Sequence, residues 1–271
     1  YKEIGLRGLE FILDFLRDEQ GGYHSSLSAV DERNVEGGAY WWSQAELNEL
    51  LSQDELQYLS EKGVVDVKTQ ELFLLKPIRA VALKNASDPM AERILQKLQR
   101  AEKPDMPIDD KKIASWNALV LQVLLKAQQS SSDKRYQQLA QDQFEFITTR
   151  FIQSAKNSTG FSVKRFAAQS GLAETTLEDY AQIANALQMY AQINHSEMAG
   201  KLAVALVRQA LNTFYIDGRW IQDPEGLVPG DKGDTVIQDN VLESPLTVLL
   251  RTALQLPTLD KSLKEVVNKM A

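Results

Sequence analysis

The stretch Ile108-Asp109-Asp110-Lys111-Lys112-Ile113-Ala114-Ser115-Trp116-Asn117 gathers two carboxylates, two amines, an indole and an amide within ten residues. It follows Pro107 and opens a long apolar segment. Apolar residues recur there at helical spacing, namely Ile113, Trp116, Val120, Val123, Leu124 and Ala127. We therefore predict a central helix with these polar groups at its start, where free N–H groups and the positive end of the helix dipole attract polar ligands.

The same helical periodicity continues on both sides of this stretch. Two capping boxes, Ser43–Glu46 and Ser52–Glu55, and the helix-start pair Asp88-Pro89 mark three further helix starts. Helices are predicted over residues 2–18, 43–62 as two short helices, 88–101, 136–151, 175–191, 195–215, 245–254 and 259–270.

Extended segments are few and short. Strands are predicted at 72–75 and 161–166, while 23–29 and 39–42 form a small hairpin or an ordered loop pair. A βαβ alternation is absent, which argues against a doubly wound sheet, and no fixed-length repeat marks a solenoid. We predict an all-α fold of helical hairpins wound into a toroid. Residues 1–271 would form a single helical domain whose long connections line a cleft at one end.

Composition excludes several classes of function. The 271 residues carry a formal net charge of −7, and nucleic-acid-binding surfaces are usually basic, so we expect no nucleic-acid partner. No apolar run approaches the roughly 18 residues that a membrane span requires. Cysteine is absent, and the two histidines, His24 and His195, are far apart. We therefore predict neither a metal site nor a cofactor.

Three short motifs resemble those of a known family. Residues 21–27, with Glu36-Gly37 and 40–42, are similar to the pattern GGFYSALDAD…EG.FYVW. Residues 109–117 are similar to DDK..TSWN, and residues 177–181 match LEDYA. In this order they resemble the YyaL-type family, in which a thioredoxin-like domain precedes an (α/α)6 barrel of the six-hairpin glycosidase kind.

The resemblance covers most of residues 1–255 and implies a fold, a ligand class and a partner. It implies kinship with sugar-active barrels such as N-acylglucosamine 2-epimerases and glycoside hydrolases, and hence a carbohydrate or small polar ligand. Since Tyr1 already lies in a helical pattern, we expect the chain to be the later part of such a barrel, with a thioredoxin-like domain ahead of it.

The chain departs from the family pattern at two places. Ser28, Ala29 and Val30 stand where the pattern has Asp-Ala-Asp, so two family acids are lost at Ser28 and Val30. Residues 243–247 match the pattern PSGNS poorly. Both segments are expected to line the cleft. Two alternatives therefore stay open, a glycoside hydrolase or epimerase-like activity and a binding role without catalysis.

Asp109, Asp110 and Asp179 are the candidate catalytic residues. Cleavage of a glycosidic bond uses two carboxyl groups roughly 5–10 Å apart, which adjacent residues rarely provide, so Asp179 or Glu178 would be the partner. The alternative is that Asp109 and Asp110 cap the helix or pair with Lys111.

The pattern Thr175–Glu178 predicts a capping box, in which Glu178 folds back on the backbone and leaves Asp179 freer for function. Candidate ligand-binding residues are Glu36, Trp42, Lys111, Trp116, Asn117, Glu178 and Tyr180.

Each has a structural alternative. Asn117 falls on the apolar face, so a hydrogen bond to a neighbouring loop is favoured over ligand contact. A place in the core is favoured over ligand contact for Trp116. For Trp42 and Trp220 a core position and a ligand contact are about equally expected.

Two functions follow. The first is a domain that binds or acts on a carbohydrate. The second is a non-catalytic interaction or scaffold domain that accompanies a thioredoxin-like domain. For the first, we predict that the helix starts near Asp110 and Asp179, and the loop edge near Trp42, lie together at one mouth of the toroid.

Overall fold

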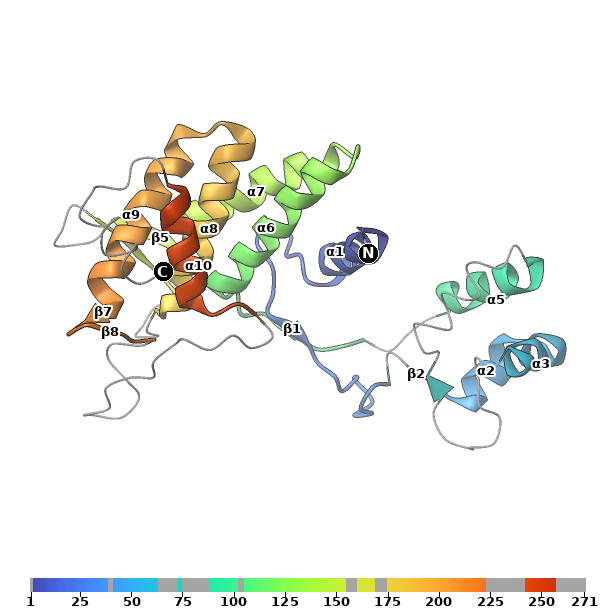
Figure 1. The fold of residues 1–271 in the computed structure, drawn as a ribbon. Coiled ribbons are helices and arrows are strands. Elements are labelled where there is room, and N and C mark those ends of the chain that lie inside the picture. The colour runs from blue at the N-terminus through green and yellow to red at the C-terminus, as the bar shows by residue number, and fades with distance from the viewer. Residues whose placement is uncertain are drawn as a thin grey trace. The chain divides into compact units, whose positions relative to one another are not determined.

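Helices dominate the structure, and strands occur only as short pairs (Figure 1). In this computed structural model the described residues are 2–38, 41–62, 73–74, 88–101, 105–154, 160–168, 175–222 and 242–256. The chain divides into a large unit, residues 1–26 and 110–271, and a small unit, residues 27–109. A helix predicted over 259–270 and the loop 223–241 lie outside the described residues.

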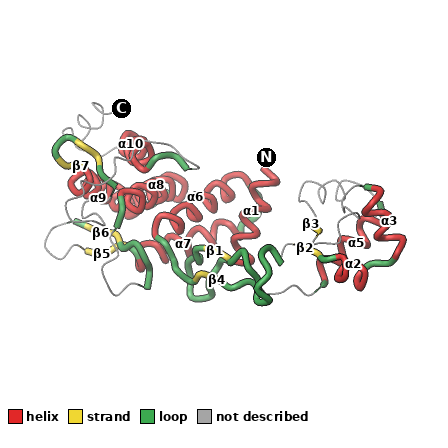
Figure 2. The backbone as a smooth tube through the Cα atoms, turned by 90° about the horizontal axis from the view of Figure 1, so that it is seen from below, coloured by secondary structure: helices red, strands yellow, loops and turns green. Residues whose placement is uncertain are grey.

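The large unit is built from two layers of helices (Figure 2). One layer places α6 (Ala114–Ser130), α8 (Leu177–Asn194) and α10 (Pro245–Gln255) side by side. In the other layer α7 (Arg135–Arg150) packs on α6, and α9 (Glu197–Phe214) packs on α8. Successive helices therefore alternate between the layers, as helical hairpins do.

Buried amide side chains connect the helices of the first layer. Gln122 of α6 donates to Gln182 Oε1 of α8 at 3.0 Å and accepts from Asn185 Nδ2 at 2.9 Å. Thr252 of α10 donates to Asn185 Oδ1 at 3.4 Å. Buried amides are costly unless they are hydrogen-bonded, so this row fixes which residues face each other. Together with the bond between Gln128 and Asn194 near the helix ends, it shows that α6 and α8 run parallel.

Short elements complete the large unit. Helix α1 (Lys2–Phe15) packs on α6. Two antiparallel hairpins follow α7 and α9, namely β5 (Ile152–Ser154) with β6 (Phe161–Val163), and β7 (Tyr215–Ile216) with β8 (Arg219–Trp220).

The small unit has its own core. Its helices are α2 (Gln44–Leu50), α3 (Gln53–Glu61) and α5 (Pro89–Arg100). Both predicted capping boxes and the Asp88 cap are confirmed. Its buried apolar residues, which belong to a cluster separate from that of the large unit, are Trp42, Leu47, Leu51, Leu59, Ala91, Ile94 and Leu98.

The strands of this region pair with distant partners. β2 (Trp41–Trp42) is antiparallel to β3 (Phe73–Leu74), and β1 (Ser26–Leu27) neighbours β4 (Ile108–Asp109). Of the two alternatives predicted for 23–29 and 39–42, the hairpin is therefore wrong, whereas the ordered loop pair is not contradicted by the described residues. The physical reason is that the intervening loop closes on itself.

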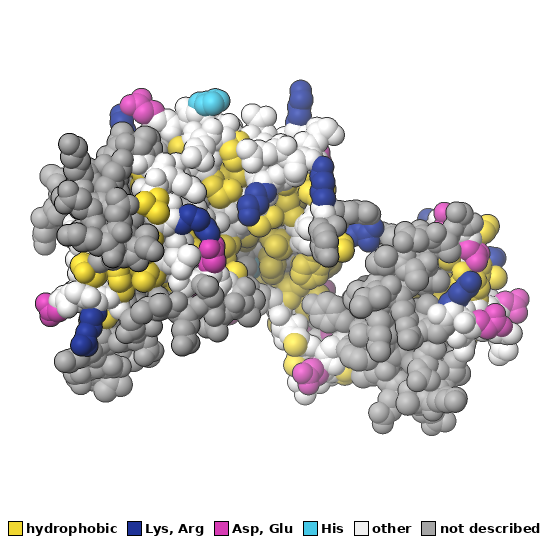
Figure 3. Space-filling view, in the orientation of Figure 1, with side chains coloured by type: hydrophobic (Ala, Val, Ile, Leu, Met, Phe, Trp, Pro, Cys, Tyr) yellow, Lys and Arg dark blue, Asp and Glu magenta, His cyan; other side chains and the backbone are white. Residues whose placement is uncertain are grey.

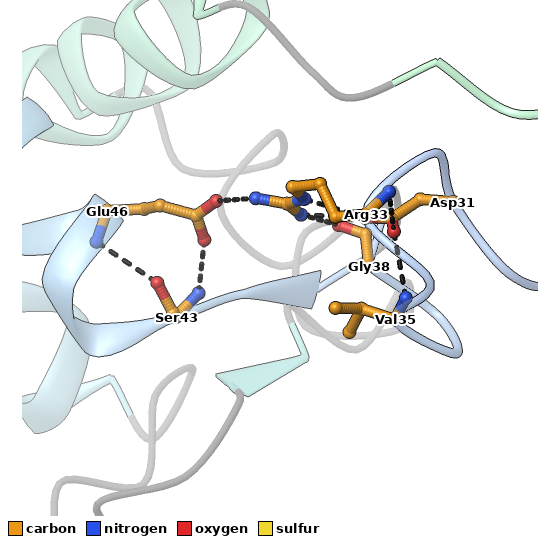
Figure 4. A network of polar contacts seen from close by, with 6 residues as sticks. All are labelled: Asp31, Arg33, Val35, Gly38, Ser43 and Glu46. Atoms are coloured by element: carbon orange, nitrogen blue, oxygen red, sulfur yellow. Dashed lines mark hydrogen bonds and ion pairs between the residues drawn. The ribbon is translucent and has the colours of Figure 1, made fainter.

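Asp31 closes that loop (Figure 4). Its buried carboxylate accepts the N–H groups of Arg33 and Val35, each at 2.9 Å, and pairs with the Arg33 guanidinium at 2.8 Å. Arg33 also pairs with Glu46 at 3.2 Å, which links the loop to the start of α2. A Cβ at Gly38 would overlap the Asp31 carboxylate, so this position requires glycine.

Three sequence predictions need correction. On α6, Trp116 is 45% and Val123 40% exposed, because the helix is covered by α7 and α8 on other faces that bury Ala118, Leu121 and Leu125. His195 does not start a helix. It ends α8 in the left-handed region at φ 53°, and Ser196 caps α9.

Candidate functional site

A cavity of about 660 Å³ opens beside the start of α6. We call it the α6 cavity. It is lined by Asp18, Gln20, His24, Asp110, Lys111, Lys112, Phe146, Arg150, Phe166, Ala167 and Ala168. Charged side chains and two phenyl rings therefore face one hollow, which suits a small ligand that has both polar groups and an apolar face.

A glycine turn forms one wall. Gly21 and Gly22 have φ of 92° and 76°, a region that side-chain-bearing residues rarely adopt. The turn is closed by hydrogen bonds between the backbones of Asp18 and Gly21, and of Asp18 and Gly22, each at 3.0 Å. The ring of Phe146 lies against this turn, and a Cβ at Gly22 would overlap it. The turn thus places Asp18 and His24 next to Phe146.

Two backbone segments form another part of the lining. The Ala167 N–H donates to the Lys112 carbonyl at 3.1 Å, and the Ala114 N–H donates to the Arg165 carbonyl at 2.9 Å. Ile113 and Phe166 form an antiparallel bridge. These bonds hold residues 166–168 beside the start of α6.

Asp18, Lys112 and His24 make a compact charge cluster. The Lys112 ammonium lies 2.6 Å from Asp18 Oδ2 and 5.3 Å from the centre of the Phe146 ring. His24 Nε2 lies 3.7 Å from Asp18 Oδ2, and Nδ1 lies 3.3 Å from the Asp110 carbonyl oxygen. The hydrogen bond from Lys112, assisted by the Gln20 N–H, lowers the pKa of Asp18. Asp18 is therefore a carboxylate near neutral pH, already paired with a cation.

Asp110 and Arg150 contribute two further charged groups to the cavity lining. Both residues are exposed and line the cavity. Within the described part of the chain, neither the Asp110 carboxylate nor the Arg150 guanidinium has a hydrogen-bond or ion-pair partner. Hence a ligand can bond to each without displacing a contact made by a described residue.

Asp179 lies in the interior, in contrast to the prediction that it is freer than Glu178. It is 0% exposed, and its carboxylate accepts the N–H groups of Ser115 and Thr176, each at 3.1 Å. Arg165 lies 3.3 Å away. The capping box is Thr176 with Asp179, one residue later than predicted, because the α6 start supplies a second N–H to this carboxylate.

Asp179 also shows that the starts of α6 and α8 lie next to each other, since it bonds to both. Burial raises the pKa of its carboxyl, while the Thr176 N–H and Arg165 act in the opposite direction. With all its contacts made by the protein, and no place in the cavity lining, Asp179 acts as a link between helices.

Asn117 is likewise structural, as the sequence favoured. Its side chain accepts the Tyr23 N–H at 2.9 Å and donates to the Tyr23 carbonyl at 3.1 Å. Gln143 Nε2 donates to the same Asn117 oxygen at 3.1 Å. Asn117 thus anchors the glycine turn to α6. Tyr180 is buried, and its hydroxyl accepts the Val163 N–H at 3.2 Å.

The remaining predicted residues fall into two groups. In the large unit, Trp116 is exposed and not in the core, and Lys111 lines the cavity. Glu178 is half-buried there on the first turn of α8, and burial, followed by the charge of Asp179, raises its pKa.

The small unit holds the rest. Asp109 lies in β4, Glu36 bridges to Val30, and Trp42 is 8% exposed in the core of that unit. That they share a site with the helix starts stays a prediction.

Sequence reasoning missed Asp18, His24, Phe146, Arg150 and Phe166. The segments that bring them together in one cavity are distant along the chain, so no local spacing reveals the site. The one local signal was the Gly21-Gly22 turn, which predicts a sharp reversal but not the ring that it packs against.

Two features are absent from the described residues. They contain no group of three or more His, Asp or Glu side chains arranged to hold a metal ion. None of their helices is long and apolar enough to cross a membrane. Comparison with known proteins found no matching family model and no matching curated protein.

Proposed function

We propose that the α6 cavity binds a carbohydrate. The observation that carries this proposal is the meeting of Asp18, His24 and Asp110 with the rings of Phe146 and Phe166 around one cavity. Sugar hydroxyls both donate and accept hydrogen bonds. Carboxylates can accept from them, and an imidazole can donate to them or accept from them. The C–H face of a sugar ring suits a phenyl wall.

The arrangement of the helices supports the same class of ligand. Parallel α6 and α8 in one layer, with α7 and α9 in the other, are what part of an (α/α) toroid would contain. We propose that the large unit is such a part, of six-hairpin glycosidase-like kind. The motifs at 21–27, 109–117 and 177–181, which resemble the YyaL-type family, support this proposal independently of the cavity.

Binding without turnover is the form we favour. A glycosidase needs one carboxyl whose pKa is raised so that it can protonate the leaving group. In this cavity the pKa of Asp18 is lowered by Lys112, and Asp179 is buried elsewhere. The replacement of the family acids by Ser28 and Val30 points the same way. A glycoside hydrolase or epimerase-like activity would need Asp110 to act with a group outside the cavity lining.

Calorimetric titration with a panel of monosaccharides and disaccharides tests this proposal. At least one sugar is expected to bind, and Asp110→Asn should weaken it about tenfold, as loss of a hydrogen bond to a charged group does. Asp14→Asn is the matched control, because Asp14 is also exposed but lies on α1 away from the cavity lining. No heat with any sugar, or equal effects of the two variants, would contradict the proposal.

A second function, an interaction domain beside a thioredoxin-like domain, is favoured by a different surface. Ile4, Phe11 and Phe15 of α1 are 70%, 39% and 46% exposed. Hydrophobic side chains are visible on the large unit in the region of α6 and α1 (Figure 3). If α1 docks a partner, Phe11→Ser with Phe15→Ser should abolish association with a thioredoxin-like domain in sedimentation velocity and leave sugar binding unchanged.

A further inference from the structure

We infer that the sugar bound in the α6 cavity is acidic, with a carboxylate or phosphate group that pairs with Arg150. This inference rests on the proposed function and adds the charge of the ligand to it. The observation that carries it is the Arg150 guanidinium, which lines the cavity and has no hydrogen-bond or ion-pair partner within the described ranges.

The other charges of the cavity do not supply that partner. The Asp18 carboxylate forms an ion pair with the Lys112 ammonium at 2.6 Å, and it also accepts the Gln20 N–H at 2.8 Å. The cavity lining contains one further acid, Asp110, whose carboxylate is likewise without a partner among the described residues. Arg150 and Asp110 therefore remain as two separate groups of opposite charge on the same cavity.

The two groups come from different segments of the chain. Arg150 is the last residue of α7, one turn after Phe146, and Asp110 precedes the start of α6. A ligand that binds both the Arg150 guanidinium and the Asp110 carboxylate must accept hydrogen bonds at one end and donate them at the other. An acidic sugar does so, because its anion accepts from the guanidinium and its hydroxyls donate to the carboxylate. The phenyl rings of Phe146 and Phe166 in the same lining are available to its C–H face.

Arginine suits this task better than lysine would. Its planar guanidinium presents paired N–H groups that match the two oxygens of a carboxylate or phosphate. A structural alternative exists, since a cation at the end of a helix also interacts favourably with the helix dipole. That interaction does not require the cavity, and it is shared by Arg100, the last residue of α5.

Titration calorimetry with glucose, glucuronate, glucose 6-phosphate and inorganic phosphate separates these possibilities in the full chain. We expect glucuronate or glucose 6-phosphate to bind at least about tenfold more tightly than glucose, the ratio that one charge-assisted bond supplies. Whichever acid binds more tightly identifies the anion as carboxylate or phosphate. Arg150→Gln should remove this preference for the acidic sugar.

Arg100→Gln is the matched control, because Arg100 is also exposed at a helix end but lies in the small unit. It should not change the preference. Equal binding of glucose and both acids, or no effect of Arg150→Gln, overturns the inference and leaves the proposed function standing. Phosphate alone binding as tightly as glucose 6-phosphate also overturns it, because the sugar ring would then contribute nothing. No heat with any sugar overturns both.

Discussion

At the scale of single residues, Gly22 shapes the cavity by having no side chain. Its φ of 76° is unfavourable for an L residue, and a Cβ would overlap the Phe146 ring. We predict that Gly22→Ala lowers the free energy of unfolding by about 2 kcal/mol, through backbone strain and overpacking. Urea denaturation followed by circular dichroism measures this change.

Gly5→Ala is the matched control for Gly22. Gly5 lies inside α1 with no atom within 4 Å of an added Cβ, so alanine should stabilise the chain by roughly 0.5–1 kcal/mol through helix propensity. A loss of stability in both variants, or in neither, would be inconsistent with the geometry of the turn.

The raised pKa of Glu178 predicts that its ionisation lowers the free energy of unfolding, in a way that depends on pH. Burial and Asp179 raise its pKa above the ordinary 4.5, so ionisation disfavours the folded state. The unfavourable contribution is absent when both states are protonated, grows as the pH rises through 4.5, and is complete above the folded-state pKa. Glu178→Gln should therefore raise the melting temperature at about pH 7 and leave it unchanged below about pH 4.

Differential scanning calorimetry at both pH values checks this, with Glu49→Gln on the exposed face of α2 as control. A melting temperature that falls at neutral pH in Glu178→Gln would mean that the ionised carboxylate has a stabilising partner.

Residue-level predictions succeeded where the cause was local. The capping boxes at Ser43 and Ser52 depend on residues three apart, and both are confirmed. The structural role of Asn117 followed from a polar residue on an apolar face, but its partner Tyr23 is 94 residues away and could not be named. The pairing of Asp18 with Lys112 is equally distant and left no local pattern.

At the scale of elements, Asp179 joins the starts of α6 and α8. Asp179→Ala leaves the Ser115 N–H unsatisfied and removes the charge that faces Arg165. We expect a loss of about 2–3 kcal/mol in the free energy of unfolding, less than for a fully buried pair because Arg165 is partly exposed. The affinity for sugar should stay the same, since Asp179 does not line the cavity.

Asp133→Ala serves as the control for this variant. Asp133 is exposed beside the start of α7, where its carboxylate pairs with Arg135 at 3.4 Å, and exposed pairs contribute at most about 1 kcal/mol. If Asp179→Ala weakens sugar binding more than it lowers stability, the carboxylate acts on the ligand after all.

Most helices could be predicted from periodicity, and their ends less well. The start of α8 was predicted one residue too early, because Thr175 and Thr176 both fit the cap position. Only the N–H of Ser115, which belongs to another helix, shows that the carboxylate of the capping box is Asp179 and not Glu178. The buried face of α6 was misjudged at Trp116 because contacts with two helices, not one, decide it.

At the scale of the whole molecule, the two units could not be foreseen from the sequence. Helical patterns before and after residue 109 look alike, and Pro104 and Pro107, which precede the boundary, equally fit a turn inside one domain. The separation depends on which apolar faces meet, and Trp42 and Leu59 meet partners in their own unit. The mostly helical fold was predictable, whereas the closed toroid stays a proposal.

The most direct test of the central claim is to map sugar binding onto the backbone by NMR. The full chain, labelled with nitrogen-15, is titrated with the sugar that binds most tightly in calorimetry. We predict that the largest amide shift changes occur at Gln20, His24, Lys112 and Ala167, which form the walls of the α6 cavity. Changes confined to the small unit around Trp42, or none at saturating sugar, would contradict the claim that this cavity is the binding site.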